Sequence, residues 1–106
     1  MTRLETLLSY LEKEPNDSFL NYALALEYHK AGDTLKAIEL IVQLIARDEK
    51  YLGAYYQLGK LYEEQNKLTD AIAIYKKGKA IAAQLNDRKT LGELSEALLM
   101  IDEEEA

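Results

Sequence analysis

The chain has 106 residues, a length typical of one domain with a modest core. It contains no cysteine, which excludes disulfides, thiolate nucleophiles and cysteine-bound metals. The net charge of −6 disfavours non-specific nucleic-acid binding, because that requires a basic face. No apolar run suits a membrane span or a signal peptide, so we expect a cytoplasmic protein without membrane or nucleic-acid partners.

The first predicted element is a helix over residues 2–13, followed by Pro15. Its leucines recur at three- and four-residue spacing, which is typical of a helix with one apolar face. The residues expected to face inward are Leu4, Leu7, Leu8 and Leu11.

Residues 18–51 and 52–85 repeat one pattern with a period of 34 residues, and we call them repeat 1 and repeat 2. Each reads as a helix, a tight turn and a second helix. The turns fall at Gly32 and Asn66, the two residue types that most readily enter the left-handed conformation ending a helix. Asp33 or Thr34 is expected to cap the second helix of repeat 1, and Thr69 that of repeat 2.

Gly59 lies inside the first helix of repeat 2, where glycine costs about 1 kcal/mol relative to alanine. The equivalent residue of repeat 1 is Ala25. Small residues here predict a close approach of the two helices of each hairpin, with Ala37 and Ala71 on the facing helices. The large residues expected to interlock around the contact are Tyr28, Tyr62, Ile41 and Tyr75.

A last helix is predicted over residues 87–103, capped by Asn86 or Asp87. Its inward stripe is expected to consist of Leu91, Leu94, Leu98 and Ile101. Four consecutive apolar residues, 98–101, cannot all face one stripe, so Leu99 or Met100 should be partly exposed. That exposure suggests a homodimer formed through Leu99 and Met100, a docking face for another protein, or the edge of a longer array.

These residues resemble the tetratricopeptide repeat, a helical hairpin whose pattern has a 34-residue period. Repeat 2 matches at Tyr55, Leu58-Gly59, Tyr62, Ala71, Tyr75 and Gly78, with Ala83 in place of the proline. Repeat 1 departs at Asn21, Leu44 and Glu49. The resemblance implies an all-α fold, a right-handed superhelical stack of antiparallel hairpins with about six helices, in a single domain over residues 1–106.

The resemblance also implies a non-catalytic interaction module that receives a peptide or helix of a partner protein in a concave groove. Family geometry places on the groove Phe19, Tyr22, Leu26, His29 and Lys30 of repeat 1, and Gly53, Tyr56, Lys60, Glu63 and Glu64 of repeat 2. Tyrosine suits recognition because it offers apolar area and a hydroxyl at low entropic cost. The alternative is that Tyr22 and Tyr56 mainly pack against neighbouring helices.

Other constellations offer little chemistry, and we expect no enzyme, cofactor or metal. His29 is the only histidine, and without cysteine it is a poor start for a metal site. Lys76, Lys77 and Lys79 lie together on the second helix of repeat 2. They form either a solvated outer face or a surface for an acidic partner or nucleic acid.

Overall fold

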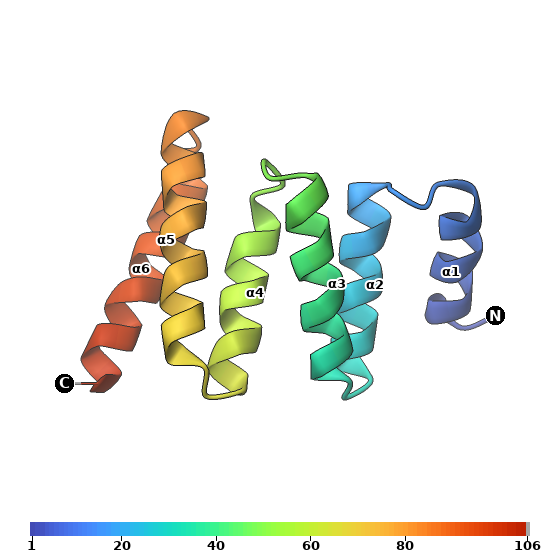
Figure 1. Cartoon of the computed structure of the whole chain (residues 1–106), viewed down its shortest axis with the longest axis horizontal. Helices are drawn as coiled ribbons and strands as arrows, with labels where there is room; N and C mark the ends of the chain where they lie inside the picture. Colours follow the sequence, from blue (N-terminus) through green and yellow to red (C-terminus); the bar gives the residue numbers. More distant parts are fainter. Residues whose placement is uncertain (106) are drawn as a thin grey trace. The chain divides into compact units, whose positions relative to one another are not determined.

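The computed structural model describes residues 1–105, with side chains described for residues 1–101. Within this part the chain forms six α-helices and no strand (Figure 1). The helices are α1 (Arg3–Lys13), α2 (Ser18–Lys30), α3 (Thr34–Arg47), α4 (Gly53–Glu64), α5 (Leu68–Gln84) and α6 (Arg88–Glu105). The predicted all-α class is confirmed. None of these helices is both long and apolar enough for a membrane span.

Packing between helices divides the chain into two compact units, Met1–Glu49 and Lys50–Ala106. In the N-terminal unit, α2 packs against α1 and α3. In the C-terminal unit, α5 packs against α4 and α6. Consecutive helices of each unit run in opposite directions (Figure 1). The single domain and the right-handed superhelix stay predictions.

An aspartate directly precedes three of the helices and caps their N-termini. Asp17, Asp33 and Asp87 each accept a hydrogen bond from the backbone N–H three residues later, at 2.8–3.1 Å. This arrangement pairs one of the amide groups that a helix N-terminus leaves open. The predicted caps at Asp33 and Asp87 are therefore confirmed.

The turn residues behave as expected, but the predicted cap at Thr69 is wrong. Gly32 and Asn66 adopt the left-handed conformation, with φ of 94° and 57°. The next helix, α5, has Lys67 at its N-cap position and no side-chain cap. Thr69 lies within the first turn of α5, too far along the helix to cap it.

The inward face of α1 is narrower than predicted. Leu7 is buried with Ala23 and Leu24 of α2, and Leu4 and Leu11 pack against this cluster. Leu8 is instead 42% exposed, so its predicted inward position is wrong. Since the contacts of α1 are with α2, one narrow stripe of α1 is covered, and residue 8 lies about 100° around the helix from residue 7.

Gly59 and Gly78 mark the close contacts of the C-terminal unit. A Cβ atom at residue 59 would lie 2.0 Å from Cε1 of Tyr75, and one at residue 78 would lie 2.7 Å from Cβ of Tyr55. The tight contact at Gly59 involves Tyr75, one of the large residues predicted to lie around it. What occupies the space beside Gly59 is the ring of Tyr75 rather than the opposite backbone, and packing of this buried ring offsets the weak helix propensity of glycine.

The predicted inward stripe of α6 agrees with the structure. Leu94 and Ile101 are fully buried, and Leu91 and Leu98 are half-buried. Leu99 and Met100 are 62% and 52% exposed, as their position outside the stripe predicts.

Candidate functional site

The residues expected to contact a partner from repeat 1 share one face of α2. The first four, Phe19, Tyr22, Leu26 and His29, follow one another at spacings of three, four and three residues, and Lys30 follows Leu26 by four, which keeps them on one side of the helix. We call these five residues the α2 face. Phe19 is 64% exposed, Lys30 is exposed, and Tyr22, Leu26 and His29 are half-buried. Asn21 and Leu24, which lie on the opposite side of α2, are buried.

The corresponding residues of repeat 2 form a connected cluster on α4. The Nζ atom of Lys60 lies 5.4 Å from the ring centroid of Tyr56 and 3.7 Å from Oε2 of Glu63. The same carboxylate oxygen accepts a hydrogen bond from the hydroxyl of Tyr75 on α5. The rings of Tyr56 and Tyr75 are tilted by 46°, with centroids 6.3 Å apart. We call Tyr56, Lys60 and Glu63 the α4 cluster; Gly53 and Glu64, at the two ends of α4, are exposed.

Tyr75 supports the α4 cluster from inside the unit. Its side chain is fully buried, and burial raises its pKa above the usual value, with the hydrogen bond to Glu63 raising it further. The hydroxyl therefore stays protonated at neutral pH and remains a donor to the carboxylate. Sequence reasoning placed Tyr75 in the helix contact but missed this bond, because the equivalent residue of repeat 1 is Ile41, which has no hydroxyl.

The arrangement offers binding groups: aromatic surface, an ammonium and a carboxylate held close together. Tyr22, His29 and Glu64 also make polar, ionic or aromatic interactions of their own. Within the described residues, no three histidine or acidic side chains are grouped so that they could hold a metal ion.

The family model described as "Anaphase-promoting complex, cyclosome, subunit 3", a tetratricopeptide-type family, matches residues 1–78. The chain belongs to this tetratricopeptide repeat family. None of the curated proteins compared with it matches.

Similar solved structures support the assignment of this chain to the tetratricopeptide repeat family. A tetratricopeptide repeat domain protein from Salinibacter ruber is 40% identical over 81% of this chain and 96% of its own, with a TM-score of 0.76 for the crystal structure. A solution structure of such a protein from the same organism is 41% identical over 81% of this chain and 87% of its own, with a TM-score of 0.78. A Bordetella parapertussis protein shares the fold at 23% identity and a TM-score of 0.87, over 100% of this chain and 92% of its own.

Proteins with tetratricopeptide repeats generally mediate protein–protein interactions, and such repeats are typically non-catalytic scaffolds. The α2 face and the α4 cluster are the surfaces that the sequence analysis assigned to that role.

Proposed function

We propose that this tetratricopeptide repeat protein is a non-catalytic adaptor that binds a peptide or helix of a partner protein through the α2 face and the α4 cluster. The observation that carries the proposal is the α4 cluster itself. Its carboxylate is held by the buried Tyr75, and its ammonium is held by that carboxylate and by the ring of Tyr56. Groups that are already ordered lose less conformational entropy on binding.

The two faces suit different parts of a ligand. The α2 face offers Phe19, Tyr22 and Leu26, which favour apolar side chains. The α4 cluster offers Lys60 and Glu63, which favour polar groups and backbone amides of the ligand. The proposal includes two expectations from the sequence: that these surfaces line a concave groove, and that the protein is cytoplasmic.

Affinity capture from a source lysate tests the proposal, comparing wild type with the variant Tyr22→Ala/Tyr56→Ala/Lys60→Glu. The matched control is Tyr10→Ala/Lys50→Glu, which changes the same residue types at exposed positions outside both faces. Circular dichroism first establishes that all three proteins are helical. We expect a partner retained by wild type and control and lost by the variant; a partner retained equally by all three would contradict the proposal.

A second candidate function is a structural homo-oligomer, favoured by the exposure of the adjacent residues Leu99 and Met100. In that case the mass measured by sedimentation should increase with concentration, and Leu99→Glu/Met100→Glu should abolish the increase. A dimer that survives these substitutions would contradict a dimer interface at this position.

A further inference from the structure

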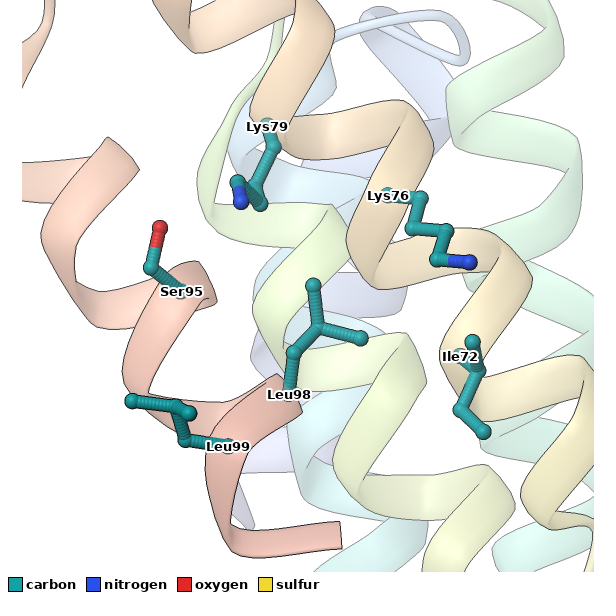
Figure 2. Close-up of a pocket in the computed structure, with 6 residues that line it drawn as sticks. All are labelled: Ile72, Lys76, Lys79, Ser95, Leu98 and Leu99. Carbon is teal, nitrogen blue, oxygen red and sulfur yellow. The ribbon is translucent and has the colours of Figure 1, made fainter. Parts of the chain in front are cut away.

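An open groove with a volume of about 450 Å³ lies between helices α5 and α6 of the C-terminal unit. Ile72, Lys76 and Lys79 line it from α5, and Ser95, Leu98 and Leu99 line it from α6 (Figure 2). None of the residues of the α2 face or the α4 cluster is among them. The groove is therefore a surface that the proposed function does not use.

The centre of this α5–α6 groove is apolar. Figure 2 shows Leu98 projecting from α6 into the space between the two helices, with Ile72 on the α5 side. Both side chains are half-buried, and Leu99 beside them is 62% exposed. Aliphatic side chains gathered in this way gain free energy when a second apolar surface removes them from water.

The α5 side of the groove is positively charged. Among residues 1–101, whose side chains the structure describes, no ion pair involves Lys76 or Lys79. The segment 72–84 of α5 contains three lysines and no acidic residue. On α6, Glu93 and Glu96 are exposed but do not line the groove. The chain as a whole carries a net charge of −6, so the positive charge of this segment is opposite in sign to that of the whole protein.

The spacing of the two lysines indicates the shape of the ligand. Lys76 and Lys79 are three residues apart on one helix, so their stems lie about 5–6 Å apart. Carboxylates one turn apart on another helix have the same separation. The groove also follows two packed helices, so a third helix can lie along it and place an apolar ridge on Leu98.

We propose that the α5–α6 groove binds an acidic amphipathic helix of a partner protein. Its apolar side chains pack on Ile72, Leu98 and Leu99, and its carboxylates pair with Lys76 and Lys79. Two lysines on an acidic protein are too few to neutralise a nucleic-acid backbone, so a protein ligand is favoured. The proposal does not depend on the proposed function of the α2 face and the α4 cluster.

The test uses a fluorescein-labelled synthetic helix with leucines at positions i, i+3, i+4 and i+7 and glutamates on both sides of this stripe. The matched peptide has lysine at every glutamate position. Fluorescence anisotropy should show that the glutamate peptide binds wild type at least about tenfold more tightly than the lysine peptide, because only one complements the lysines. Binding should also weaken as salt is raised.

Two variants with matched controls locate the binding. Lys76→Glu/Lys79→Glu should weaken the glutamate peptide by at least about tenfold and strengthen the lysine peptide, whereas Lys77→Glu, on the same helix but outside the groove, should change neither by more than about twofold. Leu99→Glu should reduce binding, while Leu35→Glu, equally exposed on α3, should not. The variant Tyr22→Ala/Tyr56→Ala/Lys60→Glu should still bind the glutamate peptide, which separates this proposal from the previous one.

Three results would overturn the proposal. The first is equal binding of the two peptides, or binding that Lys76→Glu/Lys79→Glu leaves unchanged. The second is a dimer of the chain alone that Lys76→Glu/Lys79→Glu dissociates but the glutamate peptide does not dissociate. In that case a second copy of the chain would occupy the groove. The third is a DNA duplex that binds more tightly than the peptide and loses affinity in the same variant.

Discussion

The two repeats solve the same packing problem with different pairs of side chains. In repeat 2, Gly59 leaves room for the ring of Tyr75. At the equivalent positions repeat 1 has Ala25, which is larger than glycine, and Ile41, which is smaller than tyrosine, and both are buried. We therefore expect packing of the hairpin to depend on the sum of the two volumes more than on either volume alone.

At a second pair of positions, the larger side chain is on the first helix in repeat 2 and on the second helix in repeat 1. In repeat 2, Tyr55 contacts Gly78, and in repeat 1 the equivalent residues are Asn21 and Leu44. Leu44 is almost fully buried. The amide of Asn21, buried as well, donates to the backbone carbonyls of Pro15 and Asp17 at 3.0 and 2.8 Å. We therefore expect the departures of repeat 1 from the family pattern at Asn21 and Leu44 to compensate each other in volume.

The largest expected effect comes from removing the large member of this second pair. Leu44→Ala should lower the free energy of unfolding by about 2–5 kcal/mol, because it opens a cavity at a position that is almost fully buried. Urea denaturation measures the effect. Val42→Ala, on the same helix but exposed, is the control. Equal costs of the two substitutions would contradict the burial of Leu44 in the core.

The first pair is tested by giving repeat 2 the residues of repeat 1. Gly59→Ala should cost about 1–3 kcal/mol in the free energy of unfolding, because the new Cβ overlaps the buried Tyr75 ring. Adding Tyr75→Ile, which reproduces the Ala25–Ile41 pair, should recover part of that loss. A double-mutant cycle by urea denaturation measures the coupling, and strictly additive costs would contradict the exchange of volumes.

The hydroxyl of Tyr75 separates the repeats further, since Ile41 has none. Tyr75→Phe should cost about 1.5 kcal/mol at neutral pH, because it removes a hydrogen bond to a carboxylate. The pKa of Tyr75 is raised in the folded protein, so the unfolded chain loses this proton first as pH rises. Stability should therefore fall above about pH 10, and Tyr75→Phe should reduce that fall. Thermal unfolding between neutral pH and pH 11 tests this, and identical alkaline losses in the two proteins would refute it.

The smallest expected effect concerns the start of the second helix in each repeat. Asp33 caps α3, while the equivalent residue of α5 is Lys67, in nearly the same backbone conformation and without a side-chain cap. Asp33→Ala should destabilise the protein by about 1 kcal/mol, and Lys67→Asp should stabilise it by a similar amount. Thr69→Asp is the control for added charge near the helix N-terminus, because residue 69 is the second residue of α5 and cannot cap it. A gain from Thr69→Asp as large as that from Lys67→Asp would assign the effect to charge alone.

For the α2 face and the α4 cluster, the sequence predicted which residues share one side of a helix, but not the contacts between helices. The resemblance to tetratricopeptide repeats assigned Tyr22, Leu26 and His29 of α2, and Tyr56, Lys60 and Glu63 of α4, to the candidate binding surface. Helical spacing, which is a local property, keeps each set on one side of its helix. The link from Lys60 through Glu63 to Tyr75 was not predictable, because it joins residues of two helices. Their role in binding stays a prediction.

The sequence by itself determined the helices, their order and the left-handed turns at Gly32 and Asn66, and it limited two of the caps to Asp33 or Thr34 and to Asn86 or Asp87. Each of these depends on backbone preferences and on hydrogen bonds between residues a few positions apart. Tertiary structure decided that Leu8 is exposed, that the ring of Tyr75 fills the space at Gly59, and that Lys76 and Lys79 border an apolar groove between α5 and α6. These outcomes depend on which side chain of one helix meets which space on another, and a pattern within one helix does not contain that information.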